Sequence, residues 1–166
     1  MLNVTDDSGF LAVVVPAAYQ GFVSKNWQLD QLFRHFSAQM SRRALLLWGT
    51  GLEGLWRVEV RNRRSEVRGF REVTGPIHVS GGAVLVTNYE SLTMAAQFDD
   101  VVLPEPHERN QVVPLPDGDY CCRIVQLFDP ELKESSAESS GPDFIVEFTR
   151  PKMLPPEWSE VPWFKL

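Results

Sequence analysis

Residues 75–128 read GPIHVSGGAVLVTNYESLTMAAQFDDVVLPEPHERNQVVPLPDGDYCCRIVQLF, and this stretch decides the fold. It contains three apolar runs, at 77–80, 83–87 and 120–128. Gly81-Gly82 and Pro116-Asp117-Gly118 precede the second and third runs and are typical of tight turns. Short apolar runs bounded by turn residues indicate strands. The stretch therefore predicts the middle of a β-rich domain.

Further strands are predicted on both sides of this stretch, at 10–15, 44–48, 55–60, 66–73 and 143–149. The glycine-containing loop 49–54 is expected to join its two flanking strands into a pair. Residues 55–73 are expected to form a hairpin with an arginine-lined outer face. We therefore expect a mainly β fold, a β-sandwich or distorted barrel of about seven to nine strands.

One amphipathic α-helix is predicted near residues 27–40, and Asn26 is placed to cap its start. Its apolar side chains recur at helical spacing, at Leu29, Leu32, Phe33, Phe36 and Met40. Residues 89–98 are ambiguous between a short helix that begins near Ser91 and a strand entered through a bend. We expect the bend and an edge strand.

The composition indicates a single globular domain. The chain has 166 residues, of which 43% are hydrophobic and 23% are charged. We expect one β-rich domain at 1–150 and a separate C-terminal tail at 151–166. The tail holds four prolines together with Trp158 and Trp163, so it is irregular yet too apolar to be left exposed. We expect it to pack on the domain, and docking on a partner is the alternative.

The charges are distributed unevenly along the chain, although the net charge is −6. An arginine cluster lies in the middle, at Arg57, Arg61, Arg63, Arg64, Arg68 and Arg71. Two interpretations remain open: a solvated strand face whose arginines pair with acids on neighbouring strands, or a patch that binds an anion or a partner.

The proline-interrupted segment 99–110 (DDVVLPEPHERN) is predicted to be an exposed loop. It holds the candidate partner-binding residues, which are Asp99, Asp100, Glu105, His107 and Glu108. Carboxylates and imidazole can bind divalent ions, but this spacing matches no compact metal site. We therefore expect no metal there and an acidic surface that favours a basic partner.

Catalytic and cofactor motifs are missing from the sequence. The loop GTGLEG at 49–54 lacks the Lys-Ser/Thr of a phosphate-binding loop and precedes a strand where a helix is required. The chain contains no nucleophile elbow, zinc-protease motif or dinucleotide fingerprint. The adjacent Cys121 and Cys122 should point to opposite faces of a strand. We therefore expect no enzymatic activity and no cofactor.

The longest apolar runs are too short to cross a bilayer, and the acidic N-terminus does not resemble a secretion signal. A cytoplasmic protein without a membrane partner is expected. Binding to nucleic acid is disfavoured by the negative net charge and by the absence of a known binding motif.

The helix near 27–40, the run LWGTGLEGLWRVEV at 47–60 and the strand entry LPDGDY at 115–120 occur in an order that resembles small uncharacterised bacterial β-sandwich proteins. Some of these are similar to competence nuclease-inhibitor and toxin-immunity proteins. The resemblance implies a non-catalytic, acidic protein that binds and blocks another protein, often a basic nuclease. No site residue follows from it.

Three function classes remain in order of preference. The first is a non-enzymatic protein-binding protein of the immunity or inhibitor type, with a protein partner that the sequence does not identify. The second is a small-ligand-binding sandwich or barrel lined by some of the aromatic residues. The third is a hydrolase that uses a carboxylate pair.

Overall fold

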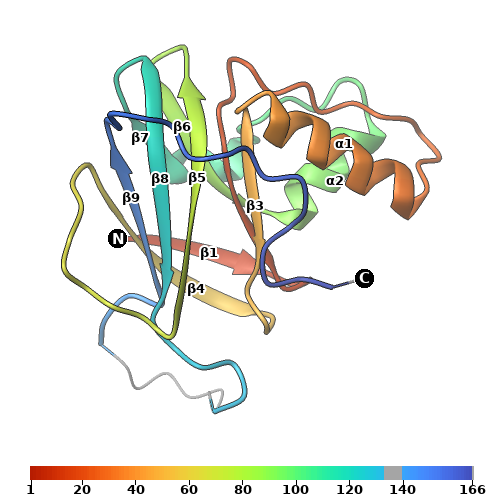
Figure 1. The fold of residues 1–166 in the computed structure, drawn as a ribbon. Helices are drawn as coiled ribbons and strands as arrows, with labels where there is room; N and C mark the ends of the chain where they lie inside the picture. The colour runs from red at the N-terminus through yellow and green to blue at the C-terminus, as the bar shows by residue number, and fades with distance from the viewer. Residues whose placement is uncertain (133–139, 166) are drawn as a thin grey trace.

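The computed structural model describes residues 1–132 and 140–165, and these form two β-sheets packed against each other (Figure 1). The five-stranded sheet has the order β1 (Leu2–Asp6), β4 (Gly54–Arg61), β9 (Phe144–Thr149), β8 (Gly118–Gln126) and β5 (Arg71–Val79). The four-stranded sheet has the order β3 (Leu45–Gly49), β2 (Phe10–Val14), β6 (Ala83–Asn88) and β7 (Val112–Pro114). The predicted mainly β, sandwich-like fold is therefore confirmed.

Two α-helices lie outside the four-stranded sheet (Figure 1). Helix α1 (Leu29–Ser41) packs on β3, and helix α2 (Tyr89–Gln97) packs on β2 and β6. A short 3-10 helix, η1 (Pro106–Gln111), precedes β7. Because the helices cover one face of this sheet and the other sheet covers the opposite face, every residue of β2 and β3 is buried. Their continuous apolar sequences follow from that double cover.

Helix α1 confirms the predicted amphipathic helix, but its start differs from the prediction. Gln28, and not Asn26, is the N-cap residue, and its backbone N–H donates to the side chain of Gln31 at 2.8 Å. Glutamine at the third helical position can reach back in this way, so the capping box starts the helix two residues later. The buried face of the helix consists of Leu32, Phe36, Gln39 and Met40.

The edge strand predicted at 89–98 was wrong, because these residues form α2. The side chain of Asn88 accepts a hydrogen bond from the Ser91 N–H at 2.8 Å and so caps the helix. Leu92, Ala95 and Ala96 then recur at helical spacing and are buried against the four-stranded sheet. A helix therefore buries all of these apolar side chains on one face, whereas a strand would have pointed some of them away from the sheet.

Two predicted strand pairings were also wrong. Strand β4 lies between β1 and β9, whereas β5 pairs only with β8, so residues 55–73 do not form a hairpin. Strands β3 and β4 belong to different sheets, and the loop 49–54 carries the chain from one sheet to the other. Alternation within a strand predicts which face is buried, but it does not predict the neighbouring strand.

Residues 62–70 cross the outer face of the five-stranded sheet instead of extending a strand, and we call them the crossing segment. Val125 and Ile145 lie on this outer face and are nevertheless buried, at 0% and 1% exposure. Gly69 permits the close approach, because a side chain there would collide with the carbonyl oxygen of Gln126. The crossing segment therefore converts an outer sheet face into buried structure.

The C-terminal residues lie along the end strands of both sheets, beside β3 and β5 (Figure 1). The indole N–H of Trp158 donates to the Thr74 carbonyl at 2.8 Å, and the Gly49 N–H donates to the Pro162 carbonyl at 3.0 Å. Trp158 is only 8% exposed. None of the helices in 1–132 and 140–165 is long and apolar enough to span a bilayer.

Candidate functional site

The five candidate residues of the acidic segment occupy two different environments. Asp99 and Asp100 follow α2 and are exposed, whereas Glu105, His107 and Glu108 lie in or beside η1. Glu108 is only 1% exposed. Its carboxylate accepts hydrogen bonds from the Thr87 hydroxyl and from the Glu105 N–H, the latter at 2.9 Å. Glu108 therefore attaches η1 to β6 and is not part of an exposed acidic surface.

Glu105, His107 and Glu108 lie closer together than their spacing in the sequence indicated. One ligand atom from each of Glu105, His107 and Glu108 lies within 4.8 Å of the others. The two oxygens of Glu108 each already accept a hydrogen bond from a protein donor. These two bonds account for the position of Glu108 through the attachment of η1 to the sheet.

A groove of about 270 Å³ lies beside Asp99, between α2 and the loop after β2. Phe22 and Val102 line it and are 50% and 74% exposed, unusually high values for such apolar side chains. Tyr19 also belongs to the lining, and its hydroxyl is buried with no hydrogen-bond partner among the described residues. Burial raises the pKa of this hydroxyl, so it remains protonated.

The groove combines exposed apolar side chains with neighbouring carboxylates, as the centre and rim of a protein interface do. Sequence reasoning identified Asp99 and Asp100 but missed Tyr19, Phe22 and Val102. The apolar triplet at 101–103, inside an otherwise polar and proline-rich segment, was the available signal. Phe22 gave no such signal, because only the tertiary structure brings the loop after β2 to α2.

The second candidate region is the arginine cluster, which the structure divides into two sets of three. Arg57, Arg61 and Arg71 are partly buried and have partners. Arg61 Nε lies 2.9 Å from Glu59 Oε1, and Arg57 Nε lies 3.6 Å from Asp143 Oδ2. Arg71 Nε donates to Gln126 at 2.9 Å. Arg57 and Arg61 thus pair with acids, in line with the first interpretation, whereas Arg71 binds the uncharged amide of Gln126.

Arg63, Arg64 and Arg68 form the second set and lie on the crossing segment. All three are exposed, and no acidic side chain in the described part of the chain lies within ion-pair distance of them. The second interpretation, a patch for an anion or a partner, stays a prediction, and this set is the one to which it can apply.

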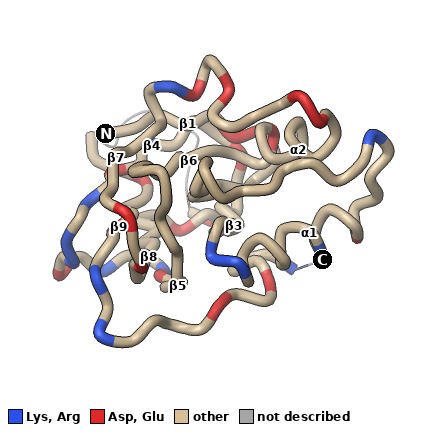
Figure 2. Tube along the Cα trace, turned by 90° about the horizontal axis from the view of Figure 1, so that it is seen from above, with Lys and Arg blue, Asp and Glu red and all other residues tan. Residues whose placement is uncertain are grey.

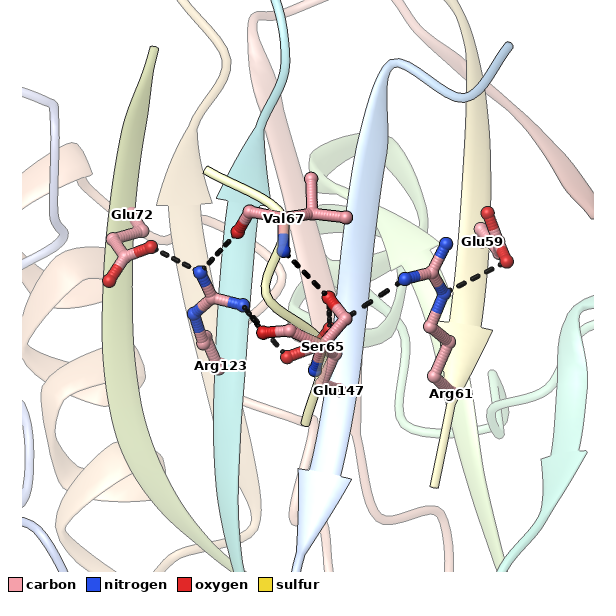
Figure 3. A network of polar contacts seen from close by, with 7 residues as sticks. All are labelled: Glu59, Arg61, Ser65, Val67, Glu72, Arg123 and Glu147. Carbon is pink, nitrogen blue, oxygen red and sulfur yellow. Dashed lines mark hydrogen bonds and ion pairs between the residues drawn. The ribbon is translucent and has the colours of Figure 1, made fainter. Parts of the chain in front are cut away.

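A buried network holds the crossing segment on the sheet (Figure 3). Arg123 of β8 donates to Glu147 of β9 at 2.9 Å and to the Val67 carbonyl at 2.7 Å. Glu147 also accepts from the Ser65 N–H at 3.0 Å. Arg123 bonds to Glu72 as well, and Arg61 Nη1 lies 4.0 Å from Glu147.

The network keeps Glu147 ionised. Burial alone would raise its pKa, but the hydrogen bonds from Ser65 and Arg123 outweigh that effect, and the pKa falls below its ordinary value. Sequence reasoning missed Arg123 as a site residue. An arginine inside the otherwise apolar strand YCCRIVQ was the available signal, because a charge on a buried strand requires a partner.

The two candidate regions lie on different sides of the molecule. In Figure 2 acidic residues lie beside α2, whereas basic and acidic residues lie together on the side of β8 and β9. The uneven charge distribution along the sequence therefore persists only in part, because Glu147 and Glu72 lie among the arginines.

Comparisons with protein-family models and with curated proteins found no match. Two solved structures share the fold. One, described as crocagin biosynthetic gene J, is 16% identical, with a TM-score of 0.56 over 92% of this chain and 94% of that chain. The other is ComJ from Bacillus subtilis, described as an inhibitor of the DNA-degrading activity of NucA; it is 10% identical, with a TM-score of 0.54 over 89% of this chain and 92% of that chain. The resemblance to competence nuclease-inhibitor proteins is therefore confirmed at the level of the fold.

Proposed function

We propose that this chain is a non-enzymatic protein that binds and inhibits another protein, and that its partner is basic. The observation that carries the proposal is the fold shared with ComJ, an inhibitor of the DNA-degrading activity of NucA, over nearly the full length of both chains. By analogy, a DNA-degrading enzyme is the partner class to test first.

The groove beside Asp99 is the surface that we assign to the partner. Phe22 and Val102 would form the apolar centre of the interface, and Asp99 and Asp100 would form its acidic rim. Opposite charge accelerates association and orients the partner, which favours a basic protein here. Glu105 and His107 lie in the same chain segment and extend the proposed rim. Glu108 contributes indirectly, because it holds η1 on β6.

The test compares two double charge reversals in the full chain. Asp99→Lys with Asp100→Lys alters the proposed rim, whereas Asp7→Lys with Glu53→Lys makes the same charge change at two exposed positions in other loops. Each protein is used to capture partners from the native lysate at low salt, and the captured protein is purified. Its degradation of plasmid DNA is then measured with and without the chain.

The proposal expects a basic protein that is captured by the wild type and by the Asp7/Glu53 variant, but only weakly by the Asp99/Asp100 variant. It also expects the wild-type chain to suppress the DNA degradation by this protein. Equal capture by all three chains would contradict the assignment of the groove. Capture without inhibition of any activity would contradict the inhibitor function.

A further inference from the structure

A pocket of about 450 Å³ opens between the crossing segment and strands β5 and β8, on the outer face of the five-stranded sheet. Its volume falls within the range of small-molecule sites. Four arginines and two glutamates contribute to its wall, namely Arg64, Arg68, Arg71, Arg123, Glu66 and Glu72. Arginine therefore dominates this pocket, although the whole chain carries a net charge of −6.

Arg123 is the most deeply buried of these arginines, and its side chain is only 6% exposed. Its two Nη atoms bind Glu147, Glu72 and backbone carbonyls. Its Nε atom is buried and has no hydrogen-bond partner among the described residues. A buried donor without an acceptor destabilises a fold unless a ligand or water satisfies it. Solvent does not reach this atom, so Arg123 contributes its charge to the wall of the pocket, and its Nε–H is not exposed there.

The other arginines differ in the contacts that they make. Arg71 is held by Gln126, and its guanidinium carbon lies 4.5 Å from the centre of the Trp163 ring. Arg64 and Arg68 are exposed and have no acidic partner in the described chain, so both are able to close on a ligand. The backbone around them is fixed by the Ser65–Glu147 bond and by the bond from the Phe70 N–H to the Gln126 carbonyl, at 2.8 Å. A fixed backbone lowers the entropy lost on binding.

Because Arg123 is paired with Glu72 and Glu147, the positive charge of the pocket comes from Arg64, Arg68 and Arg71. Glu72 is bonded to Arg123 and Glu66 is exposed to solvent. We propose that the pocket binds a small phosphate-bearing molecule, with Arg64 and Arg68 as bidentate donors and with Arg71 and Arg123 in the wall beside it. Guanidinium groups match the geometry of phosphate oxygens in this way. The proposal does not rest on the proposed inhibitor function, since the groove lies elsewhere on the molecule.

Calorimetric titration of the full chain with inorganic pyrophosphate tests the proposal. The Arg64→Ala, Arg68→Ala double variant removes two pocket arginines, and the Arg34→Ala, Arg109→Ala double variant removes two exposed arginines outside the pocket and outside the crossing segment. We expect saturable binding by the wild type and by the Arg34/Arg109 variant. We expect binding about tenfold weaker or more for the Arg64/Arg68 variant, because charge-assisted bonds are lost.

A second measurement follows Arg123 without mutating it. The Nε–H resonance of this buried guanidinium should shift on addition of pyrophosphate in the wild type and stay unchanged in the Arg64/Arg68 variant. No saturable binding, equal weakening in both double variants, or an unmoved Arg123 resonance at saturation would each overturn the proposal. Melting temperatures of the variants distinguish loss of binding from loss of folding.

Discussion

Arg123 of β8 stands directly opposite Glu147 of β9, and the two side chains form a buried ion pair with 2.9 Å between Nη1 and Oε2. The pair lies on the outer face of the five-stranded sheet, where sheets of this kind commonly meet water. Here the crossing segment covers it, through the Ser65 and Val67 contacts. The ion pair and its cover depend on each other, because neither charge could be buried without the other.

Glu147→Gln is expected to destabilise the protein by roughly 3–5 kcal/mol, the usual cost of breaking a buried ion pair. The loss leaves the Arg123 charge buried with only Glu72 to balance it. Chemical denaturation measures the free energy of unfolding. Glu59→Gln is the control, since Glu59 forms a more exposed pair with Arg61 and its loss should cost less than about 1 kcal/mol. A similar loss of unfolding free energy in both variants would contradict the idea that burial makes the Arg123–Glu147 pair more important than the Arg61–Glu59 pair.

The free energy of unfolding should also depend on pH through the ionisation of Glu147. Because the folded pKa of Glu147 is lowered, its contribution is fully present above the pKa of an unfolded glutamate, about 4.3. The contribution is lost as the pH falls from there through the folded pKa. Thermal unfolding from pH 6 to pH 3, values that bracket this window, should therefore show a steeper decline for the wild type than for Glu147→Gln. Parallel curves would show that Glu147 is not ionised in the folded protein.

Gly69→Ala is expected to destabilise the fold by roughly 1–3 kcal/mol, the cost of overpacking a tight contact. The added methyl group would collide with the Gln126 carbonyl and the Val125 side chain, which lie under the crossing segment. Gly141→Ala provides the control, because no atom lies within 4 Å of the methyl group it would add. Denaturation midpoints compare the two. A neutral Gly69→Ala would mean that the crossing segment sits farther from the sheet.

Trp158→Ala is expected to cost roughly 3–5 kcal/mol, as other deletions of buried tryptophans do. The indole is 8% exposed and donates to the Thr74 carbonyl, so its removal leaves both a cavity and an unpaired acceptor. Met153→Ala in the same tail is the control, since Met153 is 86% exposed and should change stability by less than about 0.5 kcal/mol. Small and equal losses of stability in the two variants would indicate that the tail does not stabilise β5.

Much of the fold was predictable from local patterns. Leu32, Phe36 and Met40 predicted α1 through their spacing, and the adjacent cysteines point as predicted, with Cys122 buried and Cys121 partly exposed. Local patterns did not predict the secondary structure where a helix and a strand could both bury the same apolar residues. Residues 89–98 became a helix because the Asn88 cap and the packing on β6 favoured it.

The candidate sites were predictable only in part. Asp99, Asp100 and the arginines were visible as charges, but whether a charge is free depends on what faces it. Glu108 is bonded beneath η1 and Arg61 is paired with Glu59, whereas Arg64 and Arg68 remain free of acidic partners in the described residues. Glu59 and Arg61 are neighbours on one strand, but the contact of Glu108 with Thr87 of β6 joins distant segments.

The sequence by itself determined the mainly β class, the amphipathic helix, the turns and the uneven distribution of charge, because each follows from neighbours in the chain. Only the tertiary structure decided the strand order, the path of residues 62–70 across the sheet, and the meeting of Arg123 with Glu147. Long-range pairing leaves no local pattern, since one buried strand face can pack against many others. The groove and the arginine pocket arise from such pairings, and so they first become visible in the folded chain.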